Sequence, residues 1–95
     1  MARMMMIVAD RAVRADVEVL LRKAGAHGYT ELGPATGWGE SGLRLASGAY
    51  PESSAVLFTA LDPEAEKQVR IALTGFEARA GGRVRAYAWE VEEVA

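Results

Sequence analysis

The chain has 95 residues, 51% of them hydrophobic and 25% charged, a composition typical of one globular domain. Its 13 acidic and 11 basic residues give a net charge of -2, which argues against a protein that works by neutralising nucleic-acid phosphates. The absence of cysteine excludes disulfide scaffolds, zinc ribbons and thiol catalysis, and a single histidine disfavours a transition-metal site. No apolar run approaches the about 18 residues of a membrane span, so we expect a cytoplasmic protein without membrane insertion.

The first half of the chain predicts a strand, a helix and a second strand. Residues 4–9 form a short apolar run typical of a buried strand, and Asp10 is placed to cap the helix that follows. Gly25 ends this helix, and residues 29–32 begin a second strand that runs toward Thr36. The apolar positions of the helix, which lie on one face, are Val13, Val17, Leu20, Leu21 and Ala24.

The second half repeats this order of elements. Residues 55–61 form another apolar strand, and Asp62 followed by Pro63 is a strong helix start. Gly81 and Gly82 end the helix, and residues 83–91 alternate as a closing strand. The apolar positions of this second helix repeat those of the first helix 52 residues further on: Ala65, Val69, Ala72, Leu73 and Phe76.

The two halves together predict an α+β fold with the element order βαββαβ. The economical packing is the ferredoxin-like arrangement, in which both helices cover one face of a four-stranded antiparallel sheet. We therefore expect a single domain over residues 1–95.

The strands carry apolar side chains on both faces, although two helices can cover only one. In the first strand Met4, Met6 and Val8 point to one face and Met5, Ile7 and Ala9 to the other, and in the last strand Tyr87, Trp89 and Val91 lie opposite Val84, Ala86 and Ala88. A single chain would leave one of the two sheet faces uncovered. An apolar patch of this size is larger than soluble monomers usually expose. The sequence therefore predicts that this face packs against copies of the same chain.

Residues 37–54 form the long irregular stretch of the chain. They hold four of the ten glycines together with Trp38, Arg44 and Tyr50. A loop of this length in a small domain is typically functional or disordered. Two interpretations stay open: an unstructured hairpin tip, or a loop that responds to a ligand or partner.

Several segments in this order resemble the PII-like signalling superfamily. They are Gly-Ala-His-Gly-Tyr-Thr at 25–30, Gly-Trp-Gly-Glu-Ser-Gly-Leu-Arg at 37–44, and the closing strand with its Val-Glu-Glu tail at 84–94. The Tyr-Pro pair at 50–51, before the third predicted strand, is similar to an element of the short, transporter-associated branch of this superfamily. The resemblance covers nearly the whole chain.

This resemblance implies a ferredoxin-like homotrimer that binds a small anionic ligand, such as an adenine nucleotide, in clefts between subunits. A shortened regulatory loop at 37–54 would control a membrane transporter, and the protein would not be an enzyme. The implied ligand-binding residues are Gly37, Gly39, Glu40, Ser41, Arg44, Gly81, Gly82, Arg83 and Arg85. The implied partner-binding residues are Trp38, Leu43 and Tyr50.

Other interpretations stay open beside this one. Arg83 and Arg85 alternate with apolar residues, so they could instead form salt bridges with Glu90 or Glu92. The protein could be a transporter adaptor that needs no ligand, or a trimer resembling the CutA type, with carboxylates holding a divalent cation. No catalytic constellation emerges from the sequence, and His27, between two small residues in a predicted turn, favours a surface position.

Overall fold

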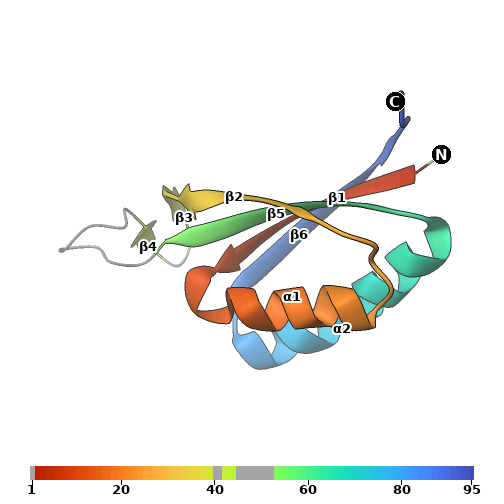
Figure 1. The fold of residues 1–95 in the computed structure, drawn as a ribbon. Coiled ribbons are helices and arrows are strands. Elements are labelled where there is room, and N and C mark those ends of the chain that lie inside the picture. The colour runs from red at the N-terminus through yellow and green to blue at the C-terminus, as the bar shows by residue number, and fades with distance from the viewer. Residues whose placement is uncertain (1, 40–41, 45–52) are drawn as a thin grey trace.

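The structure is a computed structural model, and it describes residues 2–39, 42–44 and 53–95. These residues form a main sheet with two helices packed against one of its faces and a small hairpin at one end (Figure 1). In chain order the elements are β1 (Ala2–Asp10), η1 (Arg11–Val13), α1 (Arg14–Lys23), β2 (Thr30–Ala35), β3 (Gly37–Gly39), β4 (Gly42–Arg44), β5 (Ser54–Leu61), α2 (Pro63–Ala80) and β6 (Val84–Val91).

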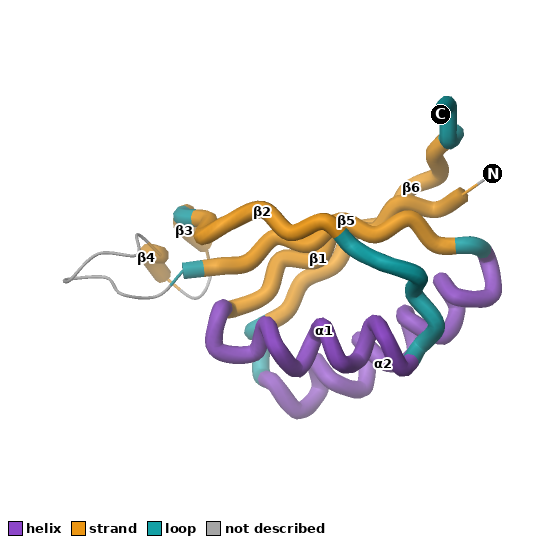
Figure 2. Tube along the Cα trace, in the orientation of Figure 1, coloured by secondary structure: helices purple, strands orange, loops and turns teal. Residues whose placement is uncertain are grey.

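The main sheet has the strand order β2-β5-β1-β6, with every neighbouring pair antiparallel. Met6 of β1 lies opposite Phe58 of β5 on one side and Tyr87 of β6 on the other. Both helices cover the same face of the sheet (Figure 2). The predicted α+β, ferredoxin-like order is thereby confirmed.

The helix boundaries follow local signals in the sequence. The Asp62 carboxylate accepts a hydrogen bond from the Ala65 amide at 2.8 Å, and Pro63 occupies the first turn of α2. Gly81 ends α2 with φ +67°, a left-handed conformation that favours glycine. Asp10 caps as predicted, accepting from the Ala12 amide at 2.9 Å, but the residues after it form the 3₁₀ turn η1 before α1 begins at Arg14.

The core lies between the sheet and the two helices. It takes alternate residues of β1 and β5 and the predicted apolar face of each helix, so that Ile7, Leu57, Val17 and Val69 are fully buried. The buried hydroxyl of Thr59 donates to the Gly28 carbonyl at 2.7 Å, which ties β5 to the segment before β2. The pattern of alternation in the strands and of 3.6-residue periodicity in the helices thus agrees with the observed burial.

The opposite face of the sheet carries apolar side chains that the protomer leaves uncovered. Leu32, Tyr87 and Trp89 on this face are 55%, 55% and 42% exposed. Met4 and Met6 stand directly across from Trp89 and Tyr87. We call this surface the open sheet face, and its apolar character agrees with the prediction from the strand pattern.

The sequence predicts an irregular segment over residues 37–54, but part of this segment forms two short strands. Gly37–Gly39 and Gly42–Arg44 pair antiparallel as β3 and β4, with Trp38 opposite Leu43. Short extended segments pair because their backbone N–H and C=O groups need partners. The predicted site residues Glu40, Ser41 and Tyr50 lie outside the described residues.

Candidate functional site

The two segments predicted to bind a ligand come from the same end of the main sheet. At this end β2 stops at Ala35 and β5 starts at Ser54, which is opposite both Ala35 and Asp10. The closing strand β6 also starts here, where Val84 pairs with Ala9. The hairpin β3–β4 and the turn at 81–83 therefore leave the sheet at one end, which we call the hairpin end (Figure 2).

Backbone hydrogen bonds fasten the segments of the hairpin end to one another. The Asp10 amide donates to the Arg83 carbonyl at 2.8 Å, and the Arg11 amide donates to the Ser53 carbonyl at 3.0 Å. Gly81 and Gly82 turn the chain with φ of +67° and +87°. The predicted residues Gly81, Gly82 and Arg83 are thus held in a fixed turn beside the end of β1.

Two cationic residues, Arg83 and Arg85, lie at the C-terminal side of this turn. Arg83 is exposed and precedes β6, so strand alternation does not fix its side. Arg85 donates from Nη1 to Glu77 Oε2 of α2 at 2.7 Å, whereas the sequence had suggested a bridge to Glu90 or Glu92. Because β6 is an edge strand, the long Arg85 side chain can reach past the sheet to α2.

A further cation at the hairpin end, Arg11, was missed by the sequence analysis. A Cβ placed on Gly33 would lie 3.4 Å from Arg11 Nη2, so the guanidinium covers the backbone of β2 near its end. Its Nη2 is 4.0 Å from Glu31 Oε2, a loose pair. The available signal was the position of Arg11 directly after a buried strand, which places it at the same sheet end as residues 37 and 83.

An ion-pair network joins α1 to β2 behind Arg11. Arg14 donates from Nε to Glu31 Oε1 at 2.7 Å, from Nη1 to Glu18 Oε1 at 3.0 Å and from Nη2 to the Tyr29 hydroxyl at 3.0 Å. The hydrogen bond with Glu31 is the main cause that raises the pKa of Arg14. The pKa of Glu18 is lowered, first by its hydrogen bond from Arg22, and the pKa of Tyr29 is raised, first by desolvation. This network is structural support for the sheet edge.

Comparison with known proteins identifies the architecture. No family model and no curated protein matches the chain. CPII, a nitrogen regulatory PII-like protein from Thiomonas intermedia K12 solved with ADP, AMP and bicarbonate bound, is 21% identical, with a TM-score of 0.75 over 95% of this chain and 87% of that one. The chain has the PII-like fold.

Two further structures with this architecture extend the comparison. A protein from Thermus thermophilus, assigned as PII-like signalling, is 22% identical, with a TM-score of 0.73 over 95% of this chain and 86% of that one. A DUF3240 family protein from Shewanella baltica is 13% identical, with a TM-score of 0.73 over 99% of this chain and 93% of that one. At these identities the matches establish the fold, and the family resemblance in the sequence is confirmed at that level.

Two of the three residues predicted to contact a partner, Trp38 and Leu43, lie on the small hairpin. Trp38 is 82% exposed, so its indole makes little contact with the rest of the described chain. Leu43 and Arg44 are placed by the backbone of β4, and Tyr50 is outside the described residues. An exposed tryptophan on a small hairpin is a residue type enriched at protein interfaces.

Metal ligands and membrane-spanning helices are two further features that can indicate a function. Residues 2–39, 42–44 and 53–95 contain no group of three or more His, Asp or Glu side chains arranged to hold a metal ion. Neither of their α-helices is long and apolar enough to span a membrane. The hairpin end and the open sheet face are the surfaces on which we base a function.

Proposed function

We propose that the chain is a non-enzymatic regulatory protein whose homotrimer binds a small anionic ligand in clefts between subunits. The ligand class is an adenine nucleotide, and the segment 37–54 carries the signal to a membrane transporter. One observation carries this proposal: nearly the whole chain shares its fold with CPII, which was solved with ADP, AMP and bicarbonate.

The chemistry of the hairpin end supports an anionic ligand. Arg83 is exposed, and among the described residues it makes no ion pair, so its guanidinium is available to a phosphate. Arg11 adds a second cation at the same end, and among the described residues the carboxylate oxygen nearest to its guanidinium is Glu31 Oε2 at 4.0 Å. A Cβ built on Gly37 or Gly82 would meet nothing within 4 Å, so a ligand can approach the backbone at these positions, whereas the Gly81 amide already donates to the Glu77 carbonyl at 3.1 Å.

The open sheet face supports assembly of the protomers. Tyr87 and Trp89 of β6 are exposed on this face, and they lie across from the partly buried Met6 and Met4 of β1. A second and third copy packed there would bury it. Clefts between copies would then lie beside the hairpin ends.

A thermal-shift experiment tests the ligand. The full chain is titrated with ADP, AMP, ATP and bicarbonate, separately and in pairs, and ligand binding should raise the melting temperature in proportion to the logarithm of concentration above the dissociation constant. Arg83→Ala and Arg11→Ala should each reduce the rise, whereas Arg70→Ala on the helix layer should leave it unchanged. No stabilisation by any nucleotide at millimolar concentration would contradict the proposal.

Deletion of residues 40–50 tests whether the segment 37–54 binds a transporter. The shortened chain should keep the subunit number and the nucleotide response of the intact chain but lose co-purification with a transporter. Comparing co-purification with and without nucleotide separates a ligand-controlled regulator from an adaptor that needs no ligand. Undiminished transporter binding by the deletion variant would exclude the loop as the docking element.

A further inference from the structure

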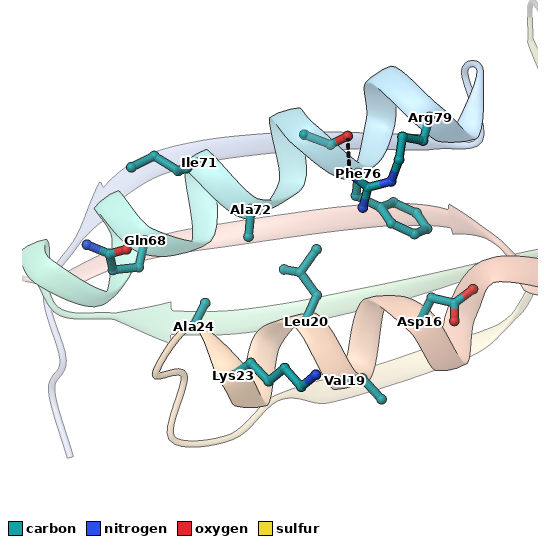
Figure 3. A pocket seen from close by; sticks show the side chains of 11 residues that line it. Asp16, Val19, Leu20, Lys23, Ala24, Gln68, Ile71, Ala72, Phe76 and Arg79 are labelled. Carbon is teal, nitrogen blue, oxygen red and sulfur yellow. Dashed lines mark hydrogen bonds between the residues drawn. The ribbon is translucent and has the colours of Figure 1, made fainter.

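A long groove runs between α1 and α2 on the side of the helix layer that faces away from the sheet. Its volume is about 650 Å³. Positions 16, 19, 20 and 23 of α1 and 68, 71, 72, 75, 76 and 79 of α2 line it, spacings that place each set on one helical face. Leu20 and Phe76 also pack against the core, so the groove adjoins the core-facing side of each helix. We call the space between them the interhelical groove (Figure 3).

Apolar and small residues make up most of the lining of the interhelical groove. Val19 and Ile71 at the rim are 49% and 61% exposed, and Leu20 and Phe76 point into the space between the helices (Figure 3). A Cβ added to Gly75 would meet only Arg79 Nη1, at 3.9 Å. No packing within the protomer accounts for a glycine in the middle of α2, where it disfavours the helix. A recess of this kind allows the backbone of another element to approach closely.

Charges at the ends of the groove are not matched within the protomer. Lys23 and Arg79 stand on opposite walls, and among residues 2–39, 42–44 and 53–95 neither pairs with a carboxylate. Arg79 donates from Nη1 to the Gly75 carbonyl at 3.1 Å and lies 5.8 Å from the Phe76 ring centre. Asp16 is the one acidic side chain of the lining, so two cations face one anion in a protein of net charge -2.

The geometry points to a docking site for an amphipathic α-helix of a partner protein, with acidic residues flanking its apolar face. A third helix can pack in the groove between two antiparallel helices, because the ridges of side chains on its surface fit between the side-chain ridges of the other two. Its apolar face would contact Val19 and Ile71 and pass over Gly75, and its acidic flanks would neutralise Lys23 and Arg79. A second copy of this chain is a poorer occupant, because it brings the same two cations and one anion and so doubles the positive excess.

This surface is independent of the one used in the proposed function. The interhelical groove lies on the helix layer, and the open sheet face lies on the opposite side of the sheet (Figure 1). Both can be covered at the same time. If the chain binds no nucleotide or forms no trimer, the proposed docking site still stands. If no helix binds in the groove, the proposed nucleotide-binding trimer still stands.

Two stapled peptides test the proposal on the full chain. Each has about 14 residues, roughly 20 Å of helix, and is stapled because short helices are marginal in water. Both carry the same leucine and alanine face, flanked by glutamate in one and by lysine in the other. Fluorescence anisotropy should show binding of the glutamate peptide at least about tenfold tighter than that of the lysine peptide. Amide NMR shifts caused by binding should follow the groove-lining positions of α1 and α2, Gly75 among them.

Three variants locate the binding. Gly75→Leu fills the recess and should weaken binding of the glutamate peptide at least about tenfold. This variant should fold, because leucine is a better helix former than glycine. Thr74→Leu, which adds the same side chain to the neighbouring exposed position, should bind as the unchanged protein does. Charge reversal at Lys23→Glu together with Arg79→Glu should exchange the preference between the peptides.

Three results would overturn the proposal. The first is absence of glutamate-peptide binding at millimolar concentration, and the second is equal affinity for both peptides. The third is a fall in assembly mass when Gly75 becomes leucine, which would identify a second copy as the occupant.

Discussion

Glu77 is the residue that joins the end of α2 to the start of β6. Its Oε1 accepts from the Val84 amide at 3.1 Å and its Oε2 accepts from Arg85 Nη1 at 2.7 Å. Both bonds hold the turn that presents Gly81, Gly82 and Arg83. The Val84 amide is partly buried, so water cannot fully replace a lost acceptor. Removing the Glu77 carboxylate should therefore lower the free energy of unfolding more than removing an exposed acceptor would.

We predict that Glu77→Ala lowers the free energy of unfolding by about 1–2 kcal/mol. Urea denaturation measures the change. Glu64→Ala is the matched control, since Glu64 on the same helix accepts one exposed hydrogen bond from Gln68 at 3.2 Å, and it should change the free energy by no more than about 0.5 kcal/mol. Equal effects of the two substitutions would contradict a fastening role for Glu77.

Glu66 gives a prediction for acid stability. Its pKa is lowered, first by the hydrogen bond from Arg3 Nε at 2.8 Å and then by Arg70. A carboxylate with a lowered folded pKa adds stability above its unfolded pKa of about 4.3, and this contribution disappears as pH falls through the folded value. Urea midpoints between about pH 6 and 3 should therefore fall less steeply for Glu66→Gln than for the unchanged chain.

Arg3 provides the check on that result. Arg3→Gln removes the first cause of the lowered pKa, so its acid dependence should move in the same direction as that of Glu66→Gln. The double variant should add little to either single change, as expected for two partners of one interaction. If the urea midpoint has the same pH dependence in the unchanged chain, both single variants and the double variant, the Arg3–Glu66 pair does not contribute to acid stability.

Single residues could be predicted from the sequence where the interaction is local. The cap by Asp62 and the left-handed turn at Gly81 each depend on neighbours within four residues. Arg14 and Glu31 are 17 residues apart, and Arg3 and Glu66 are 63 apart. Only the packing of helices on the sheet brings such pairs together, so spacing alone could not have indicated them.

At the scale of the element, α2 has one glycine inside the helix and one directly after its last residue. Gly75 lies within the helix, where a Cβ would have its nearest neighbour at 3.9 Å. Gly81 ends the helix with φ +67°, and a Cβ there would meet nothing within 4 Å. Space is therefore available at both positions, and backbone conformation alone distinguishes them.

We predict that alanine substitutions at these glycines change stability in opposite directions. Gly75→Ala should raise the free energy of unfolding by about 0.5–1 kcal/mol, because alanine is the better helix former. Gly81→Ala should lower it by about 1 kcal/mol, because a side chain disfavours the left-handed conformation. Thermal and urea unfolding of both variants measure the difference, and changes of the same sign would contradict this account.

Elements with a strong periodic pattern were predictable, and the segment without one was not. The apolar faces of both helices agree with burial, whereas β3 and β4 each have three residues and show no alternation long enough to indicate a strand. The 3₁₀ turn before α1 also differs from the prediction of a helix that starts at Asp10. Boundaries of this kind depend on how the chain leaves β1, which the sequence pattern does not contain.

The architecture of the whole molecule was predictable because the two halves repeat. The matching helix patterns 52 residues apart and the doubly apolar strands indicate the βαββαβ order and the open sheet face. The interhelical groove was not predictable in the same way. Val19 and Ile71 taken singly are ordinary exposed apolar residues, and they become one surface only when α1 and α2 lie side by side.

At the scale of the whole molecule, the open sheet face should hold three copies of the chain together. Native mass spectrometry of the full chain should give three times the chain mass of 10.2 kDa. Tyr87→Glu combined with Trp89→Glu places two charges on this face, where burying unpaired carboxylates against a copy is strongly unfavourable. Both side chains are more than two-fifths exposed in the protomer, so the variant should still fold, but as a single chain. Thr74→Glu on the helix layer should keep the mass of the assembly.

Because association stabilises the folded state, the melting temperature of the unchanged chain should rise with protein concentration, and that of the double variant should not. A mass of one chain for the unchanged protein at micromolar concentration would contradict both the trimer and the subunit clefts.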